Sequence, residues 1–234
     1  MTKKQSAHRY PLYGFYRHAI KNINRIKTRG IKILNRILEN EEKKFNIGFN
    51  TTNNKCVFLD RDGVLIEDVG YLKNPEDIII MPNSIEALKI LKAAGFLLII
   101  ITNQAGIAKG FFNMEDLAAV HEKLSKIYEN NGIIIDDLYF CPHHEKGIVE
   151  PYNIKCSCRK PETGMVVKGV KKFNIDTGKS FMVGDKDSDI MLAKNSGLKS
   201  FYIKNSMYEH DGNVVPDFYV KDLMEAAEII TKGA

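Results

Sequence analysis

Long apolar runs are missing from this 234-residue chain. None approaches the roughly 18 consecutive apolar residues of a membrane-spanning helix, so we expect no such segment. The opening stretch MTKKQSAHRYPLYGF also lacks the apolar core of a secretory signal, and we therefore expect a cytoplasmic protein. Repeats and low-complexity tracts are absent as well. The hydrophobic content of 44% excludes disorder of the whole chain.

Acidic residues are scarce at the start of the chain. Positions 1–50 hold 12 Lys/Arg and 3 Asp/Glu, whereas the remainder holds 22 Lys/Arg and 26 Asp/Glu. The net charge of +5 therefore comes from the first segment. The main body carries no basic excess of the kind that nucleic-acid binding requires, so we expect no nucleic-acid partner.

The basic segment has the pattern of an amphipathic helix. Its apolar residues recur at helical spacing: Ile20, Ile23, Ile26, Ile31, Leu34, Ile37 and Leu38. Gly30 interrupts the pattern, which fits one kinked helix or two short ones. The turn-like stretch 46–54 then predicts a linker. We therefore divide the chain into a helical extension with its linker, 1–54, and a main domain, 55–234.

The role of this extension stays open between several alternatives. The helix is solvated and packs on the main domain, or it is partly disordered. It docks on a partner or on a second copy of the chain, or it lies on a membrane surface. The sequence does not choose between them.

From residue 55 onward, predicted strands and helices alternate. The strands are 56–59, 96–101, 138–140, 181–183, 200–203 and 218–220, and the helices are 84–94, 114–130, 164–173, 188–195 and 223–230. Ser84 is the expected N-cap of its helix and Gly95 the expected C-cap. This alternation predicts an α/β fold with a doubly wound parallel sheet, in which ligands bind at the carboxyl ends of the strands.

The first candidate site is the sequence DRDG, which directly follows the predicted strand 56–59. Asp60 is a candidate nucleophile for phosphoryl transfer. Asp62 is placed to protonate the leaving oxygen and then to deprotonate water. Gly63 allows the sharp turn that follows. Two carboxylates at this spacing more often belong to a solvent-exposed turn at the end of a strand, so this assignment depends on further motifs.

Three further motifs follow other predicted strands or precede a helix. Thr102, in the sequence TNQ, offers a hydroxyl and backbone N–H groups to phosphoryl oxygens. Lys160, in the sequence CRKP, can neutralise the transferred phosphate. Asp185, with Asp189 four residues later, adds carboxylates that suit Mg²⁺, a cation that prefers oxygen ligands.

Cysteines are few, and three of the four lie close to a histidine. Cys141, His143, Cys156 and Cys158 form the pattern C-x-H-x₁₂-C-x-C. Three thiolates and one imidazole suit a closed, tetrahedral, structural Zn²⁺ site, which would fold the loop that carries Arg159 and Lys160. The remaining cysteine lies in the predicted strand 56–59 and is interpreted as a core residue.

The four motifs, in this order, resemble those of the haloacid dehalogenase superfamily over residues 56–203. The resemblance implies an aspartyl-phosphate intermediate on Asp60, with Asp62, Thr102 and Lys160 as the other catalytic residues. It also implies that Mg²⁺ is held by Asp60, Asp185 and the backbone carbonyl of Asp62, with Asp189 behind these ligands or bound through water.

Within this superfamily, the zinc loop resembles two groups, the D-glycero-D-manno-heptose 1,7-bisphosphate 7-phosphatases and the histidinol-phosphate phosphatases. The stretches 67–71, 102–110 and 141–144 favour the first group, and so a small sugar bisphosphate as substrate in nucleotide-activated heptose synthesis. The resemblance implies substrate contacts from Asp68, Val69, Gly70, Tyr71, Thr102, Asn103, Gln104, Ala105, Arg159, Lys160 and Lys186. Ala105 replaces the serine that is common there, so its contact would come from the backbone.

The spacing between motifs leaves no room for a large cap domain. Asp60 and Thr102 are 42 residues apart, enough for a loop, a short strand and one helix, and Thr102 and Lys160 are 58 residues apart. We therefore expect an open site. Histidinol phosphate or another small phosphoester is the alternative substrate. A catalytically silent binding module, recruited through the basic helix, is disfavoured because every motif residue is present.

Overall fold

The computed structural model describes residues 53–204 and 214–234. The predicted extension 1–54 therefore lies almost entirely outside the described residues, and both its helical character and the boundary at 54 stay predictions. Among the described residues, each helix is too short or too polar to span a membrane.

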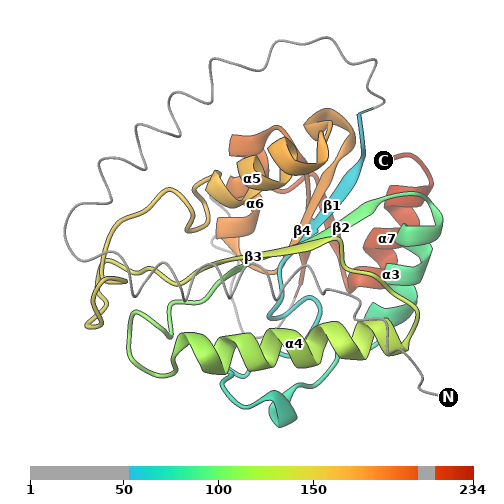
Figure 1. Ribbon diagram of the computed structural model, residues 1–234. Coiled ribbons are helices and arrows are strands. Elements are labelled where there is room, and N and C mark those ends of the chain that lie inside the picture. Colours follow the sequence, from blue (N-terminus) through green and yellow to red (C-terminus); the bar gives the residue numbers. More distant parts are fainter. Residues whose placement is uncertain (1–52, 205–213) are drawn as a thin grey trace, which may run out of the picture. The chain divides into compact units, whose positions relative to one another are not determined.

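Six parallel strands form the centre of the described domain (Figure 1). They are β1 (Cys56–Leu59), β2 (Leu97–Asn103), β3 (Asp137–Cys141), β4 (Phe181–Gly184), β5 (Lys199–Ile203) and β6 (Phe218–Val220). Their order in the sheet is β3-β2-β1-β4-β5-β6, and every neighbouring pair is parallel. The first described strand, β1, thus lies inside the sheet and later strands add outward on both sides, which confirms the predicted parallel α/β fold.

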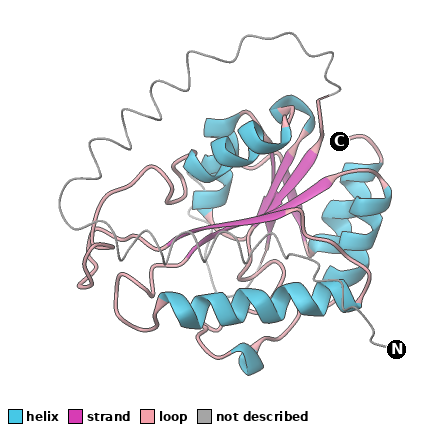
Figure 2. Cartoon of the chain, in the orientation of Figure 1, coloured by secondary structure: helices cyan, strands magenta, loops and turns pink. Residues whose placement is uncertain are grey.

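Helices cover both faces of this sheet (Figures 1 and 2). They are α3 (Ser84–Ala93), α4 (Met114–Asn130), α5 (Gly164–Phe173), α6 (Asp187–Ser196) and α7 (Leu223–Thr231). The helices α5 and α6 lie on one face. The helices α3, α4 and α7 lie on the other, where α3 packs against α7. Because crossovers between parallel strands are usually helices that pack on the sheet, both faces of the central strands are buried.

The core follows from the composition of the central strands. All four residues of β1, CVFL, are buried, as are the five inner residues of β2. Phe58, Ile99 and Met182 from three adjacent strands pack with Met165 of α5 and Leu192 of α6. Burial of each such side chain contributes about 1.5–3 kcal/mol, so this layer fixes the strands whose ends carry the motifs.

The helix predictions hold to within one residue at each end, and both predicted caps of the helix 84–94 are corrected. For α4, Asn113 and Asp116 form a reciprocal capping box, so the start of the helix agrees with the prediction. For α3, the N-cap is Asn83 (φ 62°), without a side-chain cap bond, and Ser84 is instead buried inside the helix. The C-cap of α3 is Ala94 and not the predicted Gly95, which follows it with φ 81°, a conformation that glycine adopts without strain.

Several strands extend one or two residues beyond the predicted ranges, and two short 3₁₀ helices, Pro75–Asp77 and Thr177–Lys179, were not predicted. The strand predicted before Thr102 is β2, which begins at Leu97, one residue after the predicted start, and the loop before α3 adds isolated bridges of Ile66 with Asp62 and Ile80. Within the described residues 60–96 and 104–136, helix α3, helix α4 and one 3₁₀ turn account for the regular structure, so no cap domain is inserted there.

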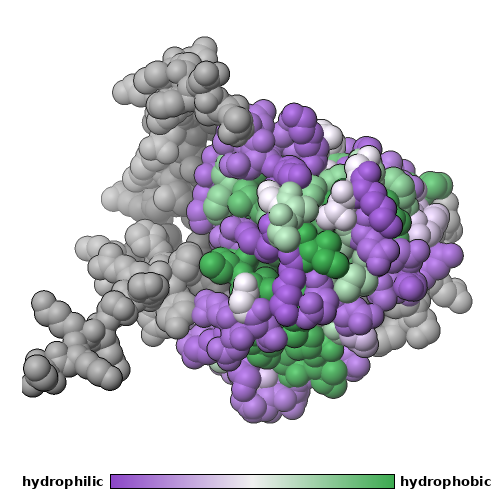
Figure 3. Space-filling view, turned by 90° about the vertical axis from the view of Figure 1, so that its right-hand side faces the viewer, coloured by the Kyte–Doolittle hydropathy of each residue, from purple (hydrophilic) through white to green (hydrophobic). Residues whose placement is uncertain are grey.

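The molecular surface on the side of α3 and α7 is mainly hydrophilic, with separate hydrophobic areas (Figure 3). Exposed apolar side chains scattered over a polar surface are normal for a folded domain.

Candidate active site

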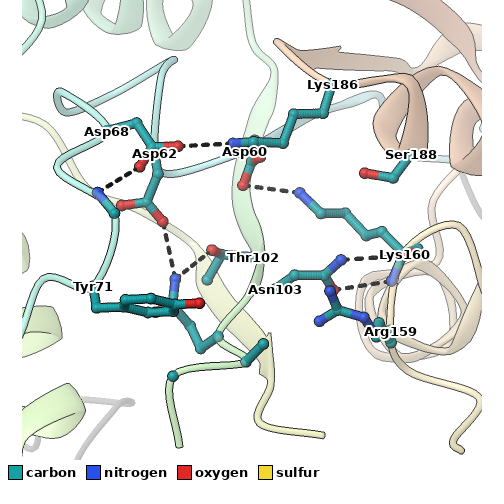
Figure 4. A pocket seen from close by; sticks show the side chains of 14 residues that line it. Asp60, Asp62, Asp68, Tyr71, Thr102, Asn103, Arg159, Lys160, Lys186 and Ser188 are labelled. Atoms are coloured by element: carbon teal, nitrogen blue, oxygen red, sulfur yellow. Dashed lines mark hydrogen bonds and ion pairs between the residues drawn. The ribbon is translucent and has the colours of Figure 1, made fainter. Parts of the chain in front are cut away.

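The predicted motifs meet at the carboxyl edge of the sheet. Asp60 directly follows β1, Thr102 ends β2 with Asn103, and Asp185 directly follows β4. Because β2, β1 and β4 are neighbours and parallel, these ends lie side by side. They border a pocket of about 350 Å³. Its lining residues are Asp60, Asp62, Asp68, Gly70, Tyr71, Thr102, Asn103, Gln104, Ala105, Gly106, Arg159, Lys160, Lys186 and Ser188 (Figure 4).

Lys160 lies between two buried carboxylates at the floor of this pocket. Its Nζ is 2.8 Å from Asp60 Oδ1 and 2.6 Å from Asp189 Oδ1, and it donates to the carbonyl oxygen of Ile101 at 3.2 Å. Burial acts to lower the pKa of Lys160, but the two carboxylates outweigh it and raise the pKa. The lysine therefore stays charged, and it holds Asp60 in a fixed orientation together with the backbone N–H of Arg61 (2.7 Å).

Three carboxylates converge beneath the pocket. Ligand oxygens of Asp60, Asp185 and Asp189 all lie within 4.8 Å of one another, and all three residues are buried. Burial and the charge of Asp60 raise the pKa of Asp185 to about 7, and burial raises the pKa of Asp189 to about 6. Such crowded anions are costly without a cation, and an all-oxygen ligand set of this kind suits Mg²⁺.

Glycine makes this close approach possible at two positions. A Cβ on Gly63 would overlap with the carboxylate of Asp185, and one on Gly184 would overlap with Asp189. Gly63 also has φ 83°, which disfavours any other residue. The turn after β1 and the end of β4 therefore need glycine in order to bring the three carboxylates together.

Asp62 is held by three donors. Nε and Nη2 of Arg61 both lie 2.9–3.2 Å from its carboxylate oxygens, and Gln104 Nε2 donates to its Oδ2 at 2.9 Å. Gln104 also donates to Thr102 Oγ1 at 2.8 Å, which links the first and second motifs. The Asp62 carboxylate is thereby oriented next to Asp60 at the pocket (Figure 4).

Charged and aromatic side chains form the rim. Lys186 Nζ lies 3.0 Å from Asp68 Oδ2 and 3.3 Å from Asp185 Oδ1. Tyr71 stacks on Phe111 with ring centroids 4.1 Å apart. Tyr71 and Arg159 lie on opposite sides of the opening in Figure 4. A ligand in the pocket would therefore meet cations from two loops and an aromatic ring from a third.

Most of the predicted substrate-contact residues line the pocket, but Val69 does not. This residue is 50% exposed and is not among those that line the pocket. Asn103 lines the pocket but uses its side chain to hold the backbone of Lys160, accepting from its N–H at 3.0 Å and donating to its carbonyl at 3.2 Å. Ala105 borders the pocket as expected.

Sequence reasoning missed Arg61, Gly106 and Ser188. The first lies inside the DRDG motif and the last inside the fourth motif, so their positions were visible in the sequence. The directions of the Arg61 and Ser188 side chains were not visible in the sequence, because these directions depend on what packs around the strand ends.

The predicted zinc ligands also converge. Cys141 ends β3, and Cys156 and Cys158 lie on the loop before α5. The Sγ atoms of Cys141 and Cys158 lie 3.5 and 3.4 Å from Sγ of Cys156, and His143 Nδ1 lies 3.4 Å from Cys158 Sγ and 3.7 Å from Cys141 Sγ. Zn–S bonds of about 2.3 Å in a tetrahedron give S···S separations of about 3.8 Å, so the four atoms fit one ion closely. Arg159 Nη1 donates to the carbonyl of His143 at 3.4 Å, which ties the loop to this cluster.

Comparison with known proteins identifies the family to which this chain belongs. Residues 157–226 match the HAD-hydrolase-like family. The D-glycero-beta-D-manno-heptose-1,7-bisphosphate 7-phosphatase of Pasteurella multocida is 36% identical over 178 residues, which cover 75% of this chain and 96% of that protein. The chain belongs to the heptose bisphosphate phosphatase family. This membership confirms the resemblance found in the motifs.

Other members of the family show the same relationship. The D-glycero-alpha-D-manno-heptose-1,7-bisphosphate 7-phosphatase of Photorhabdus laumondii is 39% identical over 64% of this chain and 82% of that protein. The crystal structure of D,D-heptose 1,7-bisphosphate phosphatase from B. bronchiseptica, complexed with magnesium and phosphate, superposes with a TM-score of 0.68 at 29% identity. The match covers 77% of this chain and 99% of that one.

Proposed function

We propose that this protein removes the C7 phosphate from D-glycero-D-manno-heptose 1,7-bisphosphate, in nucleotide-activated heptose biosynthesis. One observation carries the proposal. The four strand-end motifs converge on a single pocket, with Lys160 Nζ 2.8 Å from Asp60 Oδ1 at its floor, in a chain that aligns with nearly the whole length of family members named for this reaction.

In the first step, an oxygen of Asp60 attacks phosphorus and the bond between phosphorus and O7 of the sugar breaks. Asp62 gives its proton to the leaving O7. In the second step, Asp62 takes a proton from water as the water oxygen attacks phosphorus. The bond between phosphorus and Asp60 then breaks, which releases inorganic phosphate and restores both carboxyl groups.

Charge on the transferred phosphoryl group is stabilised by Lys160, the Thr102 hydroxyl and backbone N–H groups at the end of β2. The carboxylates of Asp60 and Asp185, with the carbonyl of Asp62, would hold Mg²⁺, and Asp189 supports this ligand set from behind. When bound, the ion supplies positive charge against the phosphate oxygens and the crowded carboxylates.

The second phosphate and the sugar lie toward the rim in this proposal. Arg159 and Lys186 provide cations for a dianionic group, and Tyr71 provides a ring face and a hydroxyl for the sugar. Asp68 orients Lys186 and offers a carboxylate to sugar hydroxyls. Without a cap domain over the described pocket, these loops determine the specificity.

We assign the Cys/His cluster to structural Zn²⁺, held by Cys141, His143, Cys156 and Cys158. All four tetrahedral positions are filled by protein ligands, so the ion has no open position for chemistry. Its role is to fold the loop from which Arg159 and Lys160 enter the pocket.

The intermediate can be tested by acid quench during turnover. Mass spectrometry of the wild-type protein should find phosphate on the peptide that carries Asp60. In Asp62→Asn this phosphate, once formed, should be lost more slowly because water is no longer activated. Asp60→Asn should release no phosphate while keeping the wild-type fold by circular dichroism. Turnover by Asp60→Asn at a tenth of the wild-type rate would exclude Asp60 as the nucleophile.

A further inference from the structure

Arg61, the residue between the two motif aspartates, is buried with 1% exposure. It does not line the pocket. A buried guanidinium costs several kcal/mol unless it is well paired, and even a paired one rarely adds net stability over an apolar side chain of similar size. The stability of the fold therefore does not explain this arginine, and its partners show what it does.

On one side, Arg61 makes a bidentate contact with the Asp62 carboxylate. Nε and Nη2 each lie within 3.2 Å of both carboxylate oxygens. Two parallel bonds from a planar group fix the plane of the carboxylate as well as its distance. Arg61 can do this only while its own side chain is held in place.

On the other side, His121 of α4 holds Arg61. His121 is fully buried, and its Nε2 lies 3.0 Å from Arg61 Nη1. A guanidinium nitrogen can only donate, so Nε2 accepts and the imidazole proton lies on Nδ1. Burial and the Arg61 cation lower the pKa of His121 well below its usual value, which keeps this acceptor neutral. Helix α4 is anchored by its capping box and by Leu117 and Leu124, which are buried.

We propose that His121 and Arg61 are positioning residues that hold Asp62 in the geometry for proton transfer to the leaving oxygen. A series of hydrogen bonds connects His121 of α4 to Arg61 and Arg61 to Asp62. Gln104 also donates to the Asp62 carboxylate. A general acid needs its position fixed to within about 0.5 Å, and this buried support supplies that precision from a rigid helix. The inference rests on the proposed role of Asp62.

The leaving group provides the test. A sugar alkoxide must be protonated as it leaves, whereas p-nitrophenolate is a stable anion that leaves unprotonated. The value of kcat/KM reports formation of the phosphoenzyme, so it isolates this step from the later hydrolysis. His121→Leu should lower kcat/KM for heptose 1,7-bisphosphate by about tenfold to a hundredfold, a fraction of what general acid catalysis contributes, and that for p-nitrophenyl phosphate by less than about threefold.

Two further variants and a control make the result specific. His121→Gln keeps an acceptor near the position of Nε2 and should recover most of the selectivity for the sugar substrate. Arg61→Lys keeps the charge but loses the bidentate contact, and should behave like His121→Leu. Leu117→Val removes apolar contact from the same face of α4. It should lower the melting temperature without changing the ratio of the two kcat/KM values.

Equal losses on both substrates in His121→Leu and Arg61→Lys would overturn the proposal, as would a changed ratio in Leu117→Val. If His121→Leu does not fold, Arg61→Lys still tests for the selective loss and His121→Gln for its recovery. Failure of the wild-type protein to act on heptose bisphosphate would instead contradict the proposed function. The leaving-group comparison would then use whichever alkyl phosphate the wild-type protein hydrolyses.

Discussion

Asp185 is the buried carboxylate whose replacement has the most informative consequence. Without magnesium it is crowded by Asp60 and Asp189, and burial raises its pKa from 3.8 to about 7. Asp185→Asn removes one charge from this cluster and keeps the shape of the side chain. We therefore expect the variant to lose magnesium-dependent activity but to be more stable than the wild-type protein when magnesium is absent.

The size of the effect follows from the pKa shift. Raising the pKa from 3.8 to about 7 destabilises the folded, ionised form by about 4 kcal/mol at most. Part of this is shared with Asp60, and Lys186, 3.3 Å away, loses a partner in the variant. We therefore expect a net gain of about 2 kcal/mol, or a melting temperature higher by about 4–8 °C for a domain of this size.

The stability advantage of Asp185→Asn depends on pH. In the unfolded chain Asp185 loses its proton near pH 3.8, whereas in the folded protein it keeps the proton until about pH 7. Wild-type stability without magnesium therefore falls as pH rises through this window. The advantage of Asp185→Asn should be complete at pH 8 and reduced to less than half at pH 5.

Melting curves in magnesium-free buffer test this, without a chelator so that the Cys/His cluster keeps its metal. Magnesium should then raise the melting temperature of the wild-type protein and leave that of Asp185→Asn nearly unchanged. Asp187→Asn is the matched control, since it removes the same charge two residues away at the start of α6 and should change stability by less than about 1 kcal/mol. A variant that melts below wild type at pH 8, or that shows the same difference at pH 5 and 8, would refute the reasoning.

Two other predictions concern the rest of the chain. Purified protein should contain one zinc per chain by metal analysis, and Cys158→Ser should lose it and lower activity because Arg159 and Lys160 are displaced. Zinc-free protein from reducing, zinc-replete preparation would contradict this. The chain shortened to residues 51–234 should keep its fold and its turnover, because every motif follows position 54. A folded shortened chain with turnover reduced a hundredfold would show that the first segment contributes to the site.

The long elements were predictable from the sequence for physical reasons. Helices α4 and α5 show clear helical periodicity, and their bounds agree with the predictions. Strands β2 and β4 were predicted too short because they end in Asn103 and Gly184, polar or flexible residues that are typical of loops. At the carboxyl edge of a parallel sheet such residues still form the backbone hydrogen bonds of the strand, and they also lie at the candidate site.

The 3₁₀ helices were missed because three residues are too few to show a period. Asn74 accepts from Glu76 N and Asp176 accepts from Gly178 N, so each turn depends on one local side-chain bond. The bond alone does not distinguish a 3₁₀ turn from an ordinary one.

The composition of the candidate site was predictable, but the roles of its supporting side chains were not. Strands that run in parallel bring Asp60, Thr102 and Asp185 to one edge of the sheet, and this follows from the predicted parallel direction alone. The bond between Arg61 and His121 joins residues 60 positions apart, and it depends on how α4 lies across the sheet. Asn103 likewise holds Lys160 from 57 positions away. Tertiary packing determines such contacts, and it cannot be predicted from the pattern of strands and helices in the sequence.

The most direct test of the proposed function is the product formed from heptose 1,7-bisphosphate. Purified protein with magnesium should be incubated with each anomer at C1, and with histidinol phosphate in parallel, and the products read by phosphorus NMR. We predict release of the C7 phosphate, leaving heptose 1-phosphate, with kcat/KM well above that for histidinol phosphate. Release of the C1 phosphate, or faster hydrolysis of histidinol phosphate than of either heptose bisphosphate, would contradict the proposal.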